Sequence, residues 1–112
     1  MKGSPAFRHR TSVTPADIDD LGHANNACYL SWILDAATAH WAVLKRSIDP
    51  QVAEAALWVV RRHEIEYLKQ AFEGDQLDVF TWVPSCTAST CDRATEIERA
   101  ADGVVIARCL SV

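Results

Sequence analysis

The chain has 112 residues, and its 49% hydrophobic and 23% charged residues are typical of a globular protein rather than a disordered one. Because a domain usually holds about 100–200 residues, we expect a single domain over residues 1–112. The net charge is −4 and no run of lysine or arginine follows one face, which argues against nucleic acid as the main partner.

The sequence predicts neither membrane insertion nor secretion. No apolar stretch approaches the roughly 20 residues that cross a bilayer, and residues 1–6 lack the apolar run of a signal peptide. We therefore expect a cytoplasmic protein whose four cysteines, Cys28, Cys86, Cys91 and Cys109, stay reduced. Cys86 and Cys91 do not have the Cys-x-x-Cys spacing of a zinc motif, so we predict no metal site.

The first half of the chain predicts a strand, a polar loop and a long helix. Apolar and polar side chains alternate over residues 7–13, as in a strand with one polar face, and Pro15 interrupts the alternation. From Asn26 to Leu44, apolar side chains recur at helical spacing and several alanines add helix propensity. This helix carries apolar side chains around much of its circumference, so we expect a sheet to wrap around it and bury it.

The second half predicts a loop or a short turn of helix over residues 47–54 and then strands. Gly74-Asp75 and Asp102-Gly103 are turn signals, and small polar residues over 84–90 are expected to end a strand. The expected strands cover residues 57–68, 77–83, 94–100 and 104–112. One strand, one helix and four strands form an α+β pattern. Because the last strand reaches Val112, we expect either a trimmed end or a last strand that pairs with another segment.

The segment over residues 17–29, DIDDLGHANNACY, places acids, a glycine, a histidine and two asparagines directly before the long helix. A helix N-terminus offers unpaired N–H groups and a partial positive charge, and polar groups beside such an end can polarise a carbonyl for attack. The alternative is an ordinary capped helix, because aspartate and asparagine are common N-cap residues. The segment alone leaves both interpretations open.

Two stretches carry a resemblance to a known family. The first is the motif Asp17-x-Asp19-x-x-Gly22-His23-x-Asn25-Asn26-x-x-Tyr29 with residues 32–36 after it, and the second is residues 65–68 followed by the pattern Phe72-x-Gly74-Asp75-x-Leu77-x-Val79. Through them the chain resembles the 4-hydroxybenzoyl-CoA thioesterase branch of the hotdog-fold superfamily. The resemblance implies an α+β hotdog fold, in which an antiparallel sheet wraps around one long central helix. It also implies a homodimer or tetramer with sites at the dimer interface, and a reaction that needs no cofactor.

The resemblance assigns roles to the motif. Asp19 would be the nucleophile or the general base, and the backbone N–H near Asn26 would polarise the carbonyl. His23 would position the thioester or assist the leaving thiolate, and Asn25 would hold the attacking water or cap the helix. The expected substrate-binding residues are Gly22, Asn26 and Tyr29. Asp17 is expected to be a structural or capping acid, and Cys28 is not expected to be a nucleophile.

The predicted function is hydrolysis of an acyl-CoA to a carboxylic acid and free CoA. An acyl-carrier-protein thioester is the alternative substrate, and a non-catalytic acyl-CoA-binding module is the alternative function; a dehydratase or a purely structural partner explains the motif less well. Arg61, Arg62 and Lys69 either meet the phosphates of CoA or lie on a solvated face. Asp35 in the helix is expected to be a satisfied buried or interface acid.

Overall fold

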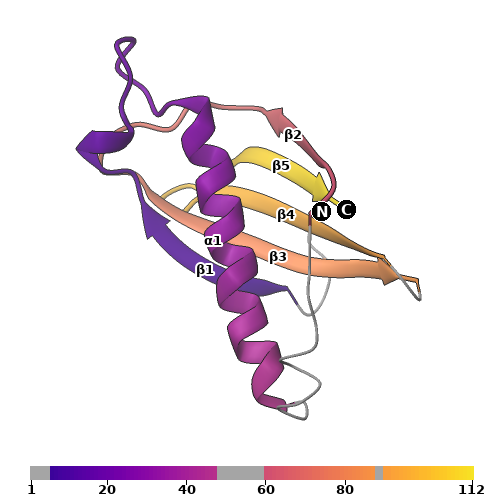
Figure 1. The fold of residues 1–112 in the computed structure, drawn as a ribbon. Coiled ribbons are helices and arrows are strands. Elements are labelled where there is room, and N and C mark those ends of the chain that lie inside the picture. Colours follow the sequence, from indigo (N-terminus) through magenta and orange to yellow (C-terminus); the bar gives the residue numbers. More distant parts are fainter. Residues whose placement is uncertain (1–5, 48–59, 88–89) are drawn as a thin grey trace.

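The computed structural model describes residues 6–47, 60–87 and 90–112, and shows one long helix lying across a five-stranded antiparallel sheet (Figure 1). The strands stand in the order β1-β3-β4-β5-β2, so β1 and β2 form the two edges. The elements are β1 (Phe7–Ser12), η1 (Pro15–Asp17), α1 (Asn26–Leu44), η2 (Lys45–Ser47), β2 (His63–Tyr67), β3 (Gln76–Cys86), β4 (Cys91–Arg99) and β5 (Val105–Ser111). This architecture confirms the expected α+β fold and the expected order of elements.

Helix α1 has the bounds that the sequence predicts, because a local cap and a local apolar pattern define it. Asn25 is the N-cap, and its side-chain oxygen accepts a hydrogen bond from the Ala27 N–H. The buried residues are Tyr29, Trp32, Ile33 and Ala36, which form one face at helical spacing. The sheet covers this face of the helix, whereas Leu34 on the opposite side is 41% exposed.

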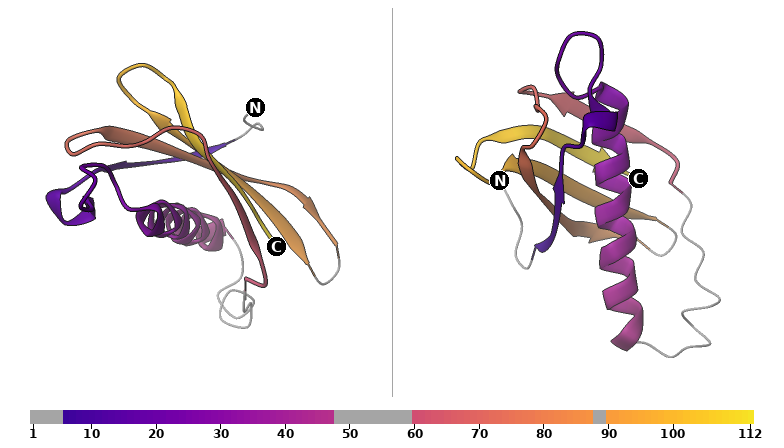
Figure 2. Two further views of the ribbon diagram at one scale, coloured as in Figure 1. Left: turned by 90° about the horizontal axis from the view of Figure 1, so that it is seen from above. Right: turned by 90° about the vertical axis from the view of Figure 1, so that its left-hand side faces the viewer.

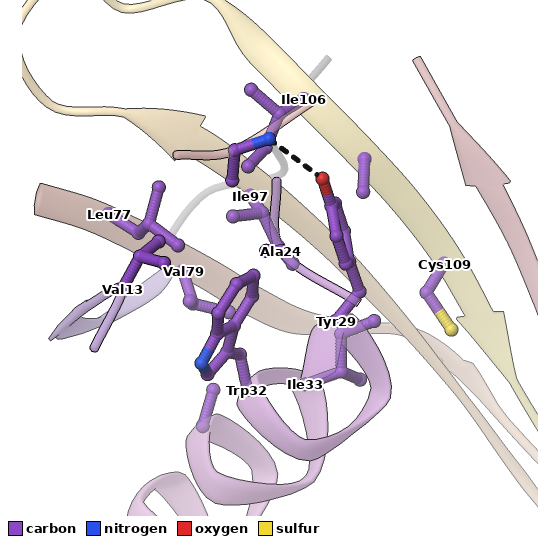
Figure 3. Close-up of a cluster of buried hydrophobic side chains, with 13 residues drawn as sticks. Val13, Ala24, Tyr29, Trp32, Ile33, Leu77, Val79, Ile97, Ile106 and Cys109 are labelled. Atoms are coloured by element: carbon purple, nitrogen blue, oxygen red, sulfur yellow. Dashed lines mark hydrogen bonds between the residues drawn. The ribbon is translucent and has the colours of Figure 1, made fainter. Parts of the chain in front are cut away.

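The hydrophobic core lies between that helix face and the inner face of the sheet (Figure 3). Leu77 and Val79 of β3, Ile97 of β4 and Ile106 of β5 are fully buried there. Burial of one such side chain stabilises the fold by about 1.5–3 kcal/mol. The sheet curves around one side of α1, as Figure 2 shows, and the helix packs against β1 and β3.

Tyr29 adds a polar connection to this core. Its side chain is buried, and its hydroxyl donates a hydrogen bond to the Lys69 carbonyl at 3.1 Å and accepts one from the Ala71 N–H at 3.0 Å (Figure 3). The main-chain N–H of Ala24 also donates to the Ala71 carbonyl, at 2.8 Å. The chain after β2 is therefore tied to the residues on both sides of the helix start.

The strands differ from their predicted bounds where a long-range partner decides them. β3 continues through Pro84 to Cys86, although the sequence predicts an end at Val83. The register with β4 shifts between Trp82 and Ser85, and such an irregularity accommodates a proline that has no N–H to donate. β2 is shorter than predicted, and the expected residues 57–59 lie outside the described residues, as does most of the expected loop over 47–54.

The prediction that all four cysteines stay reduced is wrong for one pair. Cys86 and Cys91 form a disulfide, while Cys28 and Cys109 are free thiols. The cause is the hairpin of β3 and β4, whose register places Cys86 directly opposite Cys91 with 4.1 Å between their Cα atoms. In the described part of the chain, no helix is long and apolar enough to cross a membrane.

We expect reduction of the Cys86–Cys91 disulfide to lower the free energy of unfolding by at most about 2 kcal/mol, because the bond closes a very short loop. Urea unfolding with and without a reductant measures this change. A thiol titration of the unfolded, non-reduced chain should count two free thiols. A count of four, or a far larger loss of stability, would contradict the assignment.

We expect Tyr29→Phe to destabilise the fold by about 1–3 kcal/mol, since it leaves the buried Ala71 N–H without an acceptor. Tyr67→Phe is the matched control, because Tyr67 is 45% exposed and should change stability by no more than about 0.5 kcal/mol. The urea midpoint of each variant, at unchanged slope, gives the comparison. Equal midpoints for the two variants would show that the Tyr29 hydroxyl contributes nothing.

Candidate active site

The loop before α1 is a closed turn that brings Asp19 and His23 together. The Asp19 N–H donates to the His23 carbonyl at 3.0 Å, and the Gly22 N–H donates to the Asp19 carbonyl at 3.1 Å. Gly22 has φ +86°, a left-handed conformation that side chains disfavour, which explains glycine at this position of the motif. Gly22 is exposed, so its part in the site is to shape the turn.

The Asp19 carboxylate lies beside the His23 ring. One oxygen, Oδ1, accepts a hydrogen bond from the Leu21 N–H at 2.9 Å, and the other, Oδ2, is 3.8 Å from Nδ1 of His23. The two side chains are 26% and 20% exposed, so solvent still reaches both. The Leu21 hydrogen bond holds the carboxylate in one orientation, which leaves Oδ2 as the oxygen available for chemistry.

The first turn of α1 presents a main-chain donor to the space in front of the helix. The Asn25 N–H donates to the Asp17 carbonyl, the Ala27 N–H to the Asn25 side chain, and the Cys28 N–H to the Asn25 carbonyl. Within the described residues, no group accepts a hydrogen bond from the Asn26 N–H. The helix dipole adds partial positive charge at this end, so the Asn26 N–H is suited to an oxygen that carries negative charge.

Two polar residues of the motif have structural partners. Asp17 caps η1, because its Oδ2 accepts hydrogen bonds from the Thr14 N–H at 2.9 Å and the Thr14 hydroxyl at 3.0 Å. This confirms its expected capping role. Asn25 caps α1, which confirms one of its two proposed roles. Burial and the neighbouring Asp17 raise the pKa of the Cys28 thiol, so Cys28 is a poor nucleophile.

A cleft of about 360 Å³ opens at the start of α1. Its lining comes from two segments that are far apart in the sequence: His23, Asn26, Tyr29, Tyr67, Leu68, Lys69 and Gln70. Three of the predicted site residues, His23, Asn26 and Tyr29, thus line one space. Asp19 does not line the cleft but lies beside His23, which does. Gly22 and Asn25 shape the surrounding loop.

Sequence reasoning did not assign Tyr67, Leu68 and Gln70 to the site. The signal that could have found Tyr67 and Leu68 is the second stretch of resemblance, which includes residues 65–68, whereas Gln70 lies outside the matching residues. The Tyr29 ring meets the Tyr67 ring edge-on, with 5.2 Å between centroids. Because the Tyr29 hydroxyl already has a donor and an acceptor partner, Tyr29 contributes a wall to the cleft rather than a free polar group.

Arg61, Arg62 and Lys69, which the sequence offers as partners for the phosphates of CoA, do not lie together in the structure. Lys69 lines the cleft, but Arg61 and Arg62 lie beyond the other end of β2, roughly 20 Å away along an extended chain. The Arg62 side chain is 3.5 Å from Glu64. Asp35 is exposed on the single chain, so the expectation of a buried acid is wrong and the interface alternative stays open.

No group of three or more histidine, cysteine, aspartate or glutamate side chains that could hold a metal ion occurs among the described residues. The polar groups at and beside the cleft are a carboxylate, an imidazole and a main-chain N–H at a helix end. These are suitable for attack on a polarised carbonyl.

Comparisons with known proteins identify the relatives of this chain. The thioesterase-like superfamily matches residues 13–112, and no curated protein matches the chain. A thioesterase from Thermus thermophilus, whose crystal structure contains coenzyme A and Zn, is 29% identical with a TM-score of 0.79, over 97% of this chain and 82% of that chain.

Two further solved structures share the fold at lower identity. The probable thioesterase YbaW from Escherichia coli is 24% identical with a TM-score of 0.81, over 94% of this chain and 78% of that chain. Slr0204, a 1,4-dihydroxy-2-naphthoyl-CoA thioesterase from Synechocystis, is 19% identical with a TM-score of 0.80, over 95% and 78%. The chain therefore belongs to the thioesterase-like superfamily, as a thioester hydrolase with the hotdog fold.

Proposed function

We propose that this protein hydrolyses acyl-CoA thioesters to a carboxylic acid and free CoA in the cleft at the start of α1. The observation that carries the proposal is the Asn26 N–H, which has no acceptor among the described residues and stands in a cleft beside the Asp19–His23 pair. A loop with only a structural role does not require a carboxylate, an imidazole and a main-chain N–H without an acceptor beside the same cleft.

The Asn26 N–H donates a hydrogen bond to the thioester oxygen and stabilises the negative charge that develops there, assisted by the partial positive charge of the helix end. As a nucleophile, Asp19 forms a bond to the acyl carbon while the C–S bond breaks, and water then hydrolyses the mixed anhydride. As a general base, Asp19 takes a proton from water while the water oxygen bonds to the acyl carbon. In both routes the departing CoA thiolate takes up a proton, and His23 is the neighbouring group that can deliver it.

Coenzyme A is the favoured carrier in this proposal. Lys69 supplies a cation at the cleft for a phosphate group, and the thioesterase from Thermus thermophilus was crystallised with coenzyme A. An acyl-carrier protein remains the alternative carrier. The reaction as proposed needs neither a metal nor a redox cofactor.

A second copy of the chain completes the site in this proposal. β2 is an edge strand with β5 as its neighbour, and unpaired strand edges readily pair with another chain. The cleft is lined by the residues that end and follow β2, so a partner docked on this edge lies beside the site. A small domain also gains burial by association, which agrees with the homodimer or tetramer that the family resemblance implies.

We expect Asp19→Asn to lower kcat/KM for acyl-CoA hydrolysis by about 10²–10⁴-fold, the usual contribution of a positioned acid–base group. The measurement is thiol release from acetyl-, hexanoyl-, palmitoyl-, benzoyl- and phenylacetyl-CoA. Asp20→Asn is the matched control, since Asp20 is the exposed neighbour of Asp19 and should leave the rate within about twofold.

A folded wild-type protein that hydrolyses none of these esters, yet binds them, would replace this proposal with a non-catalytic acyl-CoA-binding module. Hydrolysis that survives Asp19→Asn unchanged would remove Asp19 from the mechanism while leaving the activity in place.

We expect the protein in solution to have at least twice the 12.4 kDa mass of the chain, because pairing through β2 is part of the proposed site. Sedimentation equilibrium at several concentrations measures this mass. Full activity from a protein that is monomeric at the assay concentration would contradict the role of the second copy.

A further inference from the structure

The wall of the cleft over residues 67–70 is mostly irregular chain, because β2 ends at Tyr67. Main-chain groups in such a segment have no continuous ladder, so each needs a partner of its own. The Gln70 carbonyl accepts a hydrogen bond from Nη2 of Arg99 at 3.1 Å, and no other group among the described residues donates to it. A side chain of β4 therefore reaches the wall of the cleft directly.

The Arg99 guanidinium contacts three separate segments with its three nitrogens. Besides the bond of Nη2 to Gln70, Nη1 donates to Oδ2 of Asp102 at 3.0 Å, in the turn between β4 and β5. Nε lies 3.5 Å from Oδ2 of Asp75, in the turn after the wall. The side chain is 23% exposed and both carboxylates compensate its charge. Because the guanidinium is planar and its donors have fixed directions, three such contacts hold it in one orientation.

Asp75 carries this connection into the turn over residues 72–75. Its Oδ2 accepts a hydrogen bond from the Phe72 N–H at 3.0 Å, and its main-chain N–H donates to the Phe72 carbonyl at 3.0 Å. The Asp75 carbonyl accepts from the Val13 N–H at 2.9 Å, directly after β1. Arg99 thus holds both ends of residues 70–75, the stretch that joins the wall of the cleft to β3.

The turn that contains Asp19 and His23 does not depend on Arg99. Its hydrogen bonds join Asp19, Leu21, Gly22 and His23 to one another. In the described part of the chain, no hydrogen bond or ion pair connects Arg99 with these four residues. Loss of the Arg99 side chain should therefore displace the wall of the cleft and leave the reactive groups where they are.

We propose that Arg99 is a positioning residue, which holds the Lys69–Gln70 part of the wall where it binds the CoA portion of the substrate. The inference rests on the proposed thioester hydrolysis, in which Lys69 is the cation at the cleft for a phosphate group. Arg99 acts through the main chain of Gln70 and does not touch the reacting atoms. A wall that only a fraction of the molecules hold in place weakens substrate binding by that fraction.

We expect Arg99→Gln to raise KM for acyl-CoA esters by about 10-fold. This is the lower end of the factor of about 10 to 100 that a hydrogen bond to a charged group contributes, because the wall keeps its bonds to Ile106 and Tyr29. The value of kcat should stay within about twofold, since the turn of Asp19 and His23 is intact. Thiol release from the five esters gives both constants, and the inhibition constant of free CoA should rise by the same factor as KM.

The split between KM and kcat distinguishes positioning from a general loss of stability. Partial unfolding lowers the concentration of active protein, and therefore the apparent kcat, without changing KM. Arg10→Gln is the matched control, because Arg10 of β1 donates two hydrogen bonds to Asp78 and has no contact with residues 67–75 among the described residues. This variant should leave KM unchanged.

Two further variants assign the effect to the Gln70 contact. Asp102→Asn removes one partner of Arg99 but keeps the bond to Gln70, so KM should change by no more than about twofold. Arg99→Lys keeps the positive charge, but one ammonium group does not reproduce the three contacts, so KM should be intermediate. Arg99→Lys also carries the test if Arg99→Gln does not fold, as judged by circular dichroism.

The outcomes separate this inference from the proposed function. A wild-type KM in folded Arg99→Gln, or in Arg99→Lys if only that variant folds, would overturn the positioning role and leave the hydrolysis standing. An equal rise of KM in Asp102→Asn would do the same. If no ester is hydrolysed, isothermal titration calorimetry measures the binding of CoA and hexanoyl-CoA. Binding that Arg99→Gln weakens and Asp102→Asn does not would then support the role without catalysis, and equal or absent binding would overturn it.

Discussion

The buried hydroxyl of Tyr29 joins the first turn of α1 to the chain that follows β2, and the cleft exists where these two segments meet. That contact fixes the distance between the first turn of α1 and the wall formed by residues 67–70, which the β2–β5 ladder and the Leu68 and Lys69 hydrogen bonds to Ile106 hold on the sheet side. The Ala24–Ala71 main-chain hydrogen bond supports the same junction from the other side of the helix start. Stability and site geometry therefore depend on the same few groups, because a buried donor and acceptor must both be satisfied.

The reactive groups of the proposed site come from one closed turn and one helix end. The turn holds Asp19 beside His23 through main-chain hydrogen bonds, so neither side chain needs support from a distant strand. Asp17 and Asn25 accept hydrogen bonds from the Thr14 and Ala27 N–H groups, and the Asn26 N–H has no acceptor among the described residues. Capping and catalysis are thus complementary interpretations of this motif, because different residues of the motif serve each purpose.

The side chains on the inner face of the sheet change from apolar to polar along the strands. Near the middle of α1 it is apolar and closed by Trp32 and Ile33, whereas the rows that contain Thr81, Thr95 and Arg93 are polar. Ala107 and Cys109 of β5 belong to the same buried cluster as Tyr29 and Ile33 of α1, and Ile65 of β2 packs against this cluster.

The sequence by itself determined the order of elements, the bounds of α1 and the composition of the turn that is proposed to carry the chemistry. These depend on interactions between residues close in the chain, namely helical periodicity, the Asn25 cap and the four-residue separation of Asp19 and His23. Only the tertiary structure decided the wall of the cleft, the Cys86–Cys91 disulfide and the contact of Arg93 with His40. Strand register and the crossing of α1 create these contacts, and both are set by packing between distant segments, which local sequence patterns do not record.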